Sequence, residues 1–202
     1  MSQAWAKAVP APAPAPAPVP RPAPAAAMHG AVSAMPPESR FLNPGDWAVG
    51  GAGEVFGTLL GSCVALVLWH PQMRVGAVCH YVLPNRDERL PGEDADARYG
   101  VDAFGLMEKA LANRGIALAQ CTAKLFGGAR VYDSPGARVD VGARNIACAR
   151  DFLLSRRLAL AAENVGGLGW RRLCFDAGSG EVWMRFNAQK MTIANNLPET
   201  TS

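Results

Sequence analysis

A cysteine and a histidine stand at positions where they could form a nucleophilic pair. Cys63 directly precedes the apolar run 64–69, and His80 lies in a second apolar run, 75–83. The two runs predict a β-hairpin, and a turn centred on residues 71–72 would set Cys63 directly opposite His80, with Cβ atoms roughly 5 Å apart. A neighbouring imidazolium favours the thiolate, which is the nucleophilic form of cysteine. The spacing therefore indicates an activated cysteine, on condition that this register holds, since a one-residue slip turns His80 to the other face.

The backbone before Cys63 adds a second chemical feature. Gly61-Ser62 predicts a turn that exposes the Cys63 N–H to a developing oxyanion. An alternative stays open, because free cysteine often packs as a small buried hydrophobe and a strand histidine is often structural. The remaining cysteines and histidines are interpreted as core, turn or N-terminal residues; they are Cys79, Cys121, Cys148, Cys174, His70 and His29.

The elements that must position this pair are short strands. Residues 46–50 predict a strand, and the glycines at 50–53 predict a turn, because no Gly-Lys-Ser/Thr follows to make a phosphate loop. The continuous apolar character of 64–69 is typical of a strand buried on both faces. Residues 123–129 predict a strand end with a tight turn. A second hairpin is expected from the runs 172–176 and 181–186.

Two helices are predicted in the second half of the chain. Apolar residues at helical spacing indicate a helix over about 97–114, after a charged loop at 85–98. Asn145 is predicted to cap a second helix. The apolar face of that helix is expected to comprise Ile146, Ala149, Leu153, Leu154 and Leu158.

The N-terminal segment differs from the rest in composition. Residues 1–38 contain 13 alanines and ten of the 16 prolines of the chain. Their alternating Ala-Pro sequence favours a solvated polyproline II conformation. We therefore expect a disordered tether at 1–38, one domain at 39–188 and a flexible polar tail at 189–202.

Several classes of protein are disfavoured. The longest apolar run, 63–69, is far shorter than the roughly 20 residues that span a bilayer, and no signal peptide is indicated, so we expect a cytoplasmic protein without membrane insertion. Five cysteines without Cys-x-x-Cys suggest neither a disulfide framework nor a zinc site. A net charge of +3 without a clustered basic stripe argues against nucleic acid as the ligand.

Six sequence blocks around these residues occur one after another in a family-specific order. They are Thr58-Leu-Leu-Gly-Ser-Cys-Val-Ala-Leu, Gly76-Ala-Val-Cys-His-Tyr-Val-Leu-Pro84, Arg98-Tyr-Gly100, Ala123-Lys-Leu-Phe-Gly-Gly-Ala129, Val141-Gly-Ala-Arg-Asn145, and Gly166-Gly167 through Phe175-Asp176 to Gly180-Glu-Val182. Together they resemble CheD, the chemoreceptor glutamine deamidase family of bacterial chemotaxis, over about residues 43–186.

The resemblance implies an α+β fold of layered, packed mixed β-sheets flanked by helices, similar to deamidating bacterial toxins. It implies a cysteine hydrolase whose nucleophile matches Cys63 and whose histidine matches His80. The family's third active-site residue, a threonine, is matched by Thr58; in some members it stands one residue further upstream, where this chain has Gly57. No metal or cofactor is implied.

The resulting hypothesis is a protein-glutamine deamidase acting on methyl-accepting chemotaxis receptors. The Cys63 thiolate would attack a glutamine carboxamide, and His80 would act as general acid and then general base. Two alternatives remain. One is a non-catalytic adaptor that binds chemoreceptors or a CheC-type chemotaxis phosphatase, and the other is a cysteine protease or transglutaminase-like acyl transferase that uses the same pair.

Overall fold

The computed structural model describes residues 36–38, 40–86, 92–130 and 140–188. The predicted tail at 189–202 lies outside these residues, as does the predicted tether except for 36–38. His29 also falls outside them.

In the described part of the chain, nine strands form two separate sheets. The order is β1-β3-β8-β9 in the four-stranded sheet and β2-β5-β4-β6-β7 in the five-stranded sheet. The strands of the first are β1 (Arg40–Phe41), β3 (Val55–Leu60), β8 (Gly169–Asp176) and β9 (Val182–Ala188); those of the second are β2 (Trp47–Gly50), β4 (Val64–His70), β5 (Val75–Tyr81), β6 (Thr122–Gly127) and β7 (Leu160–Val165). Most neighbours are antiparallel, but β1–β3 and β6–β7 are parallel, so both sheets are mixed.

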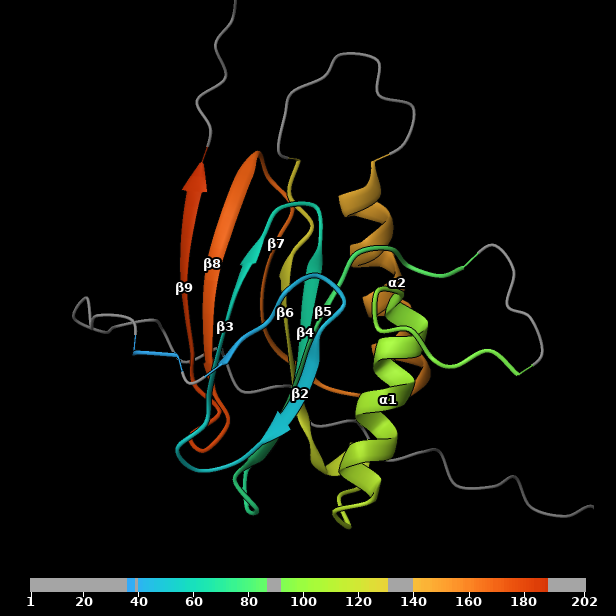
Figure 1. The fold of residues 1–202 in the computed structure, drawn as a ribbon, viewed down its shortest axis with the longest axis vertical. Helices are drawn as coiled ribbons and strands as arrows, with labels where there is room; N and C mark the ends of the chain where they lie inside the picture. Colours follow the sequence, from blue (N-terminus) through green and yellow to red (C-terminus); the bar gives the residue numbers. More distant parts are fainter. Residues whose placement is uncertain (1–35, 39, 87–91, 131–139, 189–202) are drawn as a thin grey trace, which may run out of the picture.

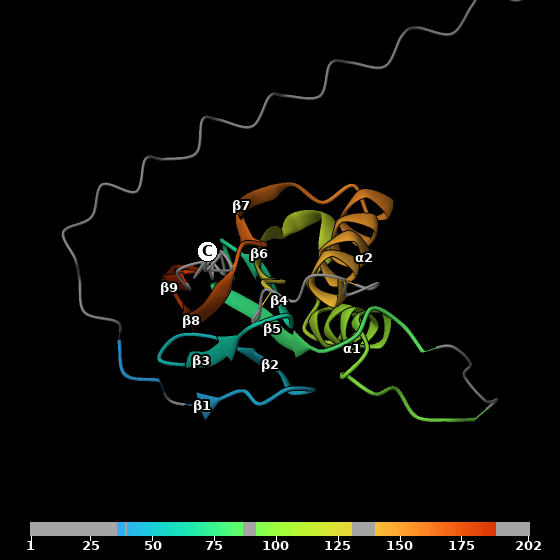
Figure 2. The same cartoon turned by 90° about the horizontal axis from the view of Figure 1, so that it is seen from above.

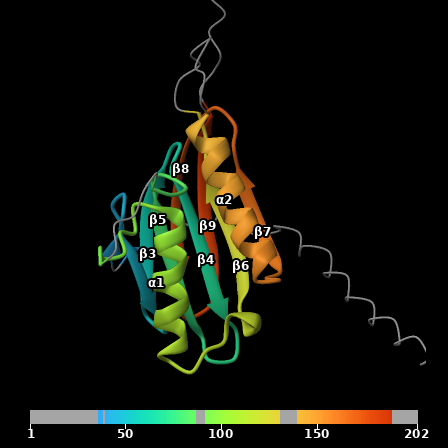
Figure 3. The same ribbon diagram turned by 90° about the vertical axis from the view of Figure 1, so that its right-hand side faces the viewer.

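The molecule is layered, with the five-stranded sheet in the middle (Figure 1). Helices α1 (Gly100–Ala112) and α2 (Val141–Ser155) cover one face of this sheet, and the four-stranded sheet covers the other (Figure 2). Figure 3 looks onto the helix side, where α1 and α2 lie next to each other over the strands. A short 3₁₀ turn, η1 (Leu118–Gln120), precedes β6. The predicted α+β class of packed mixed sheets flanked by helices is confirmed.

Strand β4 is apolar along its length because both of its faces are covered. Leu66 and Leu68 belong to the apolar layer beneath the helices, whereas Val67 packs between the sheets against a cluster that includes Phe56 and Phe175. All of these β4 side chains are fully buried. The prediction of a strand buried on both faces is confirmed.

The hairpin of β4 and β5 forms as predicted, but in a different register. His80 pairs with Ala65, not with Cys63, because the loop is a four-residue turn at 71–74. Arg74 adopts a left-handed conformation with φ of 53°, and the His70 ring accepts the Met73 N–H at 3.1 Å. The predicted opposition of Cys63 and His80 is therefore wrong by two residues. His70, interpreted as a turn residue, is instead the buried last residue of β4, next to the turn.

Helix α2 begins earlier than predicted. Asp140 is its N-cap, and the Asp140 carboxylate accepts the Ala143 N–H at 2.9 Å. Asn145 lies inside the helix and is completely buried, so the prediction that it caps the helix is wrong. Leu154 is 78% exposed and does not belong to the apolar face. Helix α1 falls within the predicted range 97–114.

Strand β7 was not predicted from the sequence. It forms the edge of the five-stranded sheet, and its Ala-Ala-Glu segment (161–163) is exposed, so the segment has no apolar pattern to indicate a strand. The second hairpin, β8–β9, was predicted and is present. Among the helices that the structure describes, none has the length and apolar character needed to cross a bilayer.

Candidate active site

Cys63 lies at the bend between the two sheets. The chain leaves β3 at Leu60, turns through Gly61 and Ser62, and enters β4 at Val64. The Cys63 side chain is half-buried and packs against an inter-sheet cluster. The buried members of this cluster are Leu60, Ala65, Phe126 and Leu173.

His80 lies in the same inter-sheet layer and is held by one side chain. The His80 ring is 2% exposed, and its Nδ1 lies 2.8 Å from the Thr58 Oγ1. Thr58 itself is buried and donates its hydroxyl hydrogen to the Leu42 carbonyl at 2.8 Å. The structure therefore brings together the threonine and the histidine that the family resemblance singled out.

These contacts define the tautomer of the ring. A hydroxyl has one hydrogen, and that of Thr58 is directed at the Leu42 carbonyl, so the Thr58 oxygen accepts a hydrogen bond from Nδ1–H. Nδ1 is also 3.4 Å from the Leu42 carbonyl oxygen, which can only accept. A neutral imidazole that carries its hydrogen on Nδ1 has a free lone pair on Nε2. Nε2 is buried and has no hydrogen-bond partner in the described part of the chain.

Cys63 and His80 share a face although they are not directly opposed. Cys63 packs against the inter-sheet cluster that contains Ala65, and Ala65 pairs with His80, so both residues lie in the layer between the sheets. The predicted register is wrong by two residues, but Cys63 and His80 still lie on the same face of the sheet, as predicted.

The electrostatics differ from the sequence-based expectation. Burial raises the pKa of the Cys63 thiol, and the opposing effect of its own backbone N–H is smaller. Burial also lowers the pKa of His80, more than the Leu42 carbonyl and the Asp46 carboxylate raise it. Both directions favour a neutral thiol and a neutral imidazole over the expected thiolate–imidazolium pair.

The backbone around Cys63 is fixed through its carbonyl groups. Gly61 O accepts from the Ala129 N–H and Cys63 O from the Gly128 N–H, both at 2.8 Å. Ser62 O accepts from the Asn145 side chain at 3.0 Å. The N–H groups of Ser62 and Cys63, in contrast, donate to no other residue within the described ranges. Both N–H groups thus have no acceptor among the described residues, and that of Cys63 acts on its own sulfur.

The other cysteines occupy positions that suit packing. Cys79, Cys121 and Cys174 are buried, and Cys148 is half-buried on α2. Burial raises the pKa of Cys79 to about 12 and those of Cys121 and Cys148 to about 11. Among the described residues, no group of three or more His, Cys, Asp or Glu side chains could hold a metal ion.

Asn145 is the residue of this region that sequence reasoning misjudged. Its position shares the buried stripe of α2 with Ile146, Ala149 and Leu153. A polar amide on such a stripe must find buried partners, which is a signal that a sequence does carry. The identity of the partners is not encoded locally, because they lie more than 60 residues away.

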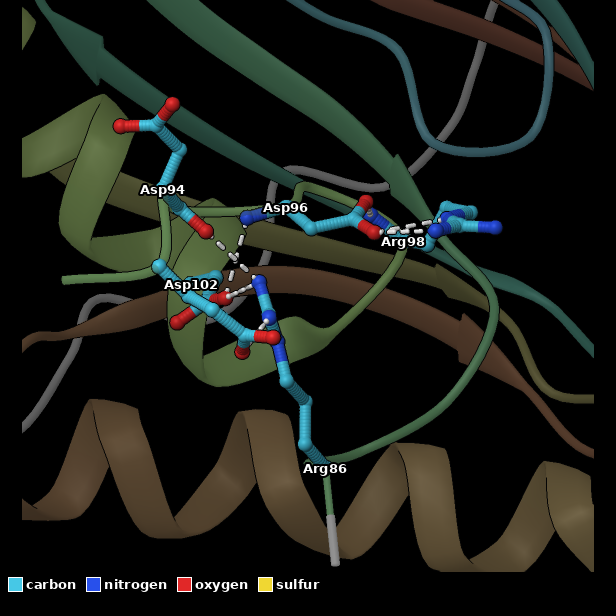
Figure 4. A network of polar contacts seen from close by, with 6 residues as sticks. Arg86, Asp94, Asp96, Arg98 and Asp102 are labelled. Carbon is cyan, nitrogen blue, oxygen red and sulfur yellow. Dashed lines mark hydrogen bonds and ion pairs between the residues drawn. The ribbon is translucent and has the colours of Figure 1, made fainter. Parts of the chain in front are cut away.

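A charged network lies next to the end of the His80 strand (Figure 4). Arg86 donates to the carboxylates of Glu93 and Asp102 and to the Asp94 carbonyl, each at 2.8 Å. Asp102 also accepts the Asp96 N–H at 3.0 Å, and Asp96 binds the Arg98 guanidinium. This network ties the loop after β5 to the first turn of α1.

Two hollows on the surface lie away from Cys63. One, of about 460 Å³, is lined by Trp47, Arg86 and neighbouring loop residues. The other, of about 700 Å³, lies between α1 and α2 beside Phe104 and Phe152. Neither hollow is lined by Cys63, His80 or Thr58. The candidate site is therefore identified from the hydrogen bonds of these residues and not from the volume of a hollow.

Comparison with known proteins gives the class of protein first. A family model described as "CheD chemotactic sensory transduction" matches residues 82–186, a segment that begins just after His80. The chain is 44% identical over 158 residues to the probable chemoreceptor glutamine deamidase CheD 3 of Dechloromonas aromatica, covering 77% of this chain and 92% of that protein. It is 40% identical over 151 residues to the corresponding CheD 2 of Albidiferax ferrireducens, covering 73% and 86%.

A more distant relative gives the same result. The probable chemoreceptor glutamine deamidase CheD 1 of Leptospira interrogans is 32% identical over 152 residues, covering 71% of this chain and 90% of that protein. This chain belongs to the CheD family. The alignment with the Dechloromonas protein covers 77% of the 202 residues. An alignment of that length includes positions 58 to 80 whether it lies toward the start or the end of the chain, so the similarity extends to the candidate site.

Proposed function

We propose that this protein is a chemoreceptor glutamine deamidase that converts specific glutamine side chains of methyl-accepting chemotaxis receptors to glutamate. The relatives it resembles over most of its length are named for this activity. The receptor's cytoplasmic helical domain is the proposed substrate, which places the enzyme in the cytoplasm.

The first half of the reaction forms a thioester. The Cys63 sulfur attacks the carboxamide carbon of the glutamine while its proton passes to His80 Nε2. The resulting oxyanion accepts hydrogen bonds from the Ser62 and Cys63 N–H groups. The imidazolium then returns the proton to the departing amide nitrogen, the C–N bond breaks, and ammonia leaves.

The second half hydrolyses the thioester. His80 Nε2 takes a proton from a water molecule as the water oxygen bonds to the carbonyl carbon, and the C–S bond breaks. The proton returns to the Cys63 sulfur, so the net reaction consumes one carboxamide and one water and yields one carboxylic acid and one ammonia. Thr58 keeps Nε2 free for both transfers by accepting the Nδ1–H. No metal or cofactor enters the scheme.

The observation that carries this proposal is the state of His80. Its Nδ1 is bound to the Thr58 hydroxyl, while its buried Nε2 has no partner among the described residues. A buried polar atom without a partner is costly in a protein that needs it only for packing. A general base that must accept a proton from an approaching thiol or water explains this cost.

The test is conversion of a chemoreceptor fragment. Purified protein is incubated with the cytoplasmic fragment, and conversion of Gln to Glu is followed by mass spectrometry. We expect conversion by the wild type and none by Cys63→Ala, whereas Cys148→Ala, a matched half-buried cysteine on α2, should retain it. Added hydroxylamine should yield the glutamyl hydroxamate, because it intercepts a thioester. No conversion by the wild type, or conversion by Cys63→Ala, would disprove the proposal.

The raised pKa of Cys63 favours a second candidate function. A cysteine that stays protonated and half-buried also suits a non-catalytic adaptor that binds chemoreceptors or a CheC-type phosphatase. The same experiment separates the two functions, because an adaptor binds the fragment without changing its mass. Chain cleavage or incorporation of an added amine would instead indicate a protease or a transglutaminase-like enzyme.

A further inference from the structure

The ladder between β4 and β5 stops one residue short of the cysteine. Its last pair is Val64 with Tyr81, and the next pair in this register would join Cys63 to Val82. That pair does not form. The Val82 N–H instead donates to the Arg98 carbonyl at 2.8 Å, and the Val82 carbonyl accepts from Asn145 Nδ2 at 2.8 Å.

One buried amide bridges the two strands where they separate. Asn145 Nδ2 donates to Val82 O at 2.8 Å and to Ser62 O at 3.0 Å. Its two acceptors therefore lie in the loop that carries Cys63 and in the continuation of the strand that carries His80. Because both neighbours are carbonyl oxygens, the amide nitrogen must face them, which fixes the orientation of the side chain.

The contact with Ser62 also determines where the Cys63 N–H points. In a trans peptide the C=O of one residue and the N–H of the next point in opposite directions from the same plane, and the described chain contains no cis peptide. Directing Ser62 O toward helix α2 therefore directs the Cys63 N–H away from it. This N–H lies near the Cys63 sulfur, where it acts to lower the thiol pKa.

The helix can reach this loop because two glycines let it approach closely. A Cβ on Gly142 would overlap the Gly128 carbonyl oxygen, and a Cβ on Gly128 would lie 2.6 Å from the Ile146 side chain. The Gly128 N–H in turn holds the Cys63 carbonyl at 2.8 Å. Asn145 is consequently placed at the loop by a tight helix–strand contact.

Ordinary burial of a polar residue does not account for this arrangement. Asn145 is fully buried, and its Oδ1 has no partner among the described residues, so half of its hydrogen-bonding capacity is lost. An apolar side chain of similar size would avoid that cost but would leave the Ser62 and Val82 carbonyl oxygens without this donor. Retaining an amide here is explained if its two donated hydrogen bonds are needed at the reacting centre.

We propose that Asn145 is a positioning residue for the reaction: its amide aims the Cys63 N–H at the oxyanion and fixes the nucleophile loop against the His80 strand. This inference rests on the proposed deamidase function. Misdirecting one oxyanion donor lowers kcat about 100-fold in comparable sites.

The experiment compares three variants on the full-length protein with the receptor fragment as substrate. Asn145→Asp keeps the shape and removes the amide, Asn145→Leu removes all polar atoms, and Tyr81→Phe is the matched control. Tyr81 donates its hydroxyl to the Asn145 backbone carbonyl at 2.5 Å, so its loss weakens the docking of α2 but leaves the Asn145 side chain in place. For each variant kcat, KM, thermal midpoint and the rate of alkylation of Cys63 by iodoacetamide are measured.

Alkylation separates positioning from general loosening. Iodoacetamide reacts at a saturated carbon and forms no oxyanion, so it reports on the thiol alone. We expect both Asn145 variants to lose about 100-fold in kcat, with KM and the alkylation rate within threefold of wild type, and Tyr81→Phe to retain kcat within threefold. A kcat loss in the Asn145 variants no greater than in Tyr81→Phe, or an equal loss of alkylation, would overturn the inference.

The results distinguish a failure of the deamidase function from a failure of the role of Asn145. An inactive wild type removes the deamidase function itself, whereas an active wild type with active Asn145 variants removes only the role of Asn145. If one Asn145 variant does not fold, the other provides the same comparison. If neither folds while Tyr81→Phe does, Asn145 is a structural residue and the inference is wrong.

Discussion

Two polar networks adjoin the strand that carries His80, and they differ in charge and in redundancy. The Leu42–Thr58–His80 chain is neutral and buried between the sheets, with one short hydrogen bond at each step and a longer 3.4 Å contact from His80 Nδ1 to the Leu42 carbonyl. The network of Arg86 and Asp102 is charged, lies in the loop after the strand, and gives each central group more than one partner (Figure 4).

The difference indicates what each network is for. A chain in which both neighbours of Nδ1 accept its hydrogen defines one tautomer and one ring orientation, which general acid–base chemistry requires. A redundant charged network tolerates the loss of one contact and holds a loop in place. We therefore expect losses in the neutral chain to appear mainly in kcat, and losses in the charged network mainly in thermal stability.

The largest effect is expected at His80 itself. His80→Ala removes the proposed general base and acid, and kcat for deamidation should fall about 1,000-fold. His70→Ala, which removes the histidine that accepts a turn N–H, is the control and should retain activity. Equal activity of His80→Ala and wild type would assign His80 to packing.

The pH dependence tests whether the resting pair is neutral. Because burial raises the pKa of Cys63, alkylation of Cys63 by iodoacetamide should increase with pH until above 9.0, the ordinary value for the thiol. From pH 6 to pH 8 the rate should increase about 100-fold, in proportion to the thiolate. A rate that is already maximal at pH 6 would instead indicate the ion pair.

The acidic limb of the deamidation profile depends on His80. Burial lowers its pKa, so the base is lost by protonation only below the ordinary value of 6.5. We expect kcat/KM to decrease as the pH falls through a midpoint under 6.5. A midpoint above 7 would contradict the direction of the shift.

A smaller loss is expected at Thr58. Thr58→Val removes the acceptor for Nδ1–H at nearly constant volume, so the ring can adopt the other tautomer, and kcat should fall about 30-fold. Thr58→Ser keeps the hydroxyl and should stay within threefold of wild type. If Val and Ser are equally active, the hydroxyl has no role in orienting the imidazole.

The charged network should respond in the opposite way. Asp102→Asn removes the charge that meets Arg86 and weakens the bond to the Asp96 N–H, and we expect the thermal midpoint to drop by about 5 °C. The value of kcat, measured well below that midpoint, should remain within twofold. A loss of kcat comparable to that of Thr58→Val would remove the distinction between the networks.

The smallest effect is expected from removing residues 1–38. Glu38 forms an ion pair with Arg172 at 2.8 Å on the four-stranded sheet, with side chains 26% and 43% exposed. Losing this pair should lower the thermal midpoint by about 1–2 °C relative to a 1–37 deletion. Both deletions should retain kcat/KM within twofold, and a large loss would indicate that the segment contributes to substrate docking.

Apolar patterning predicted several buried elements of the fold, but not strand β3. The runs 64–69 and 75–83 indicated two buried strands, and helix α1 was evident from its spacing of apolar residues, because these patterns reflect which faces are covered. Strand β7 was missed since an exposed edge strand needs no such pattern. The turn of the first hairpin was misassigned because Arg74 takes a left-handed conformation that its residue type does not suggest.

The candidate site was only partly predictable. Cys63 and His80 could be placed from their strands, since an even error in register keeps both on one face. Thr58 entered only through the family resemblance, because β3 belongs to the other sheet and no local pattern brings it to His80. The direction of the Cys63 pKa shift was not predictable, since it depends on burial by distant residues.

The pairing of β3 with β8 has a consequence for the order in which the protein matures. Thr58 is paired with Leu173, so the strand that holds the imidazole in place has a neighbour made more than 100 residues later. Contacts so far apart in the chain form slowly and late in folding. A ribosome-bound chain that has not yet extruded β8 can form the β4–β5 hairpin, whereas β3 still lacks its β8 neighbour. The strand that carries Thr58 therefore gains this neighbour only after β8 has been synthesised.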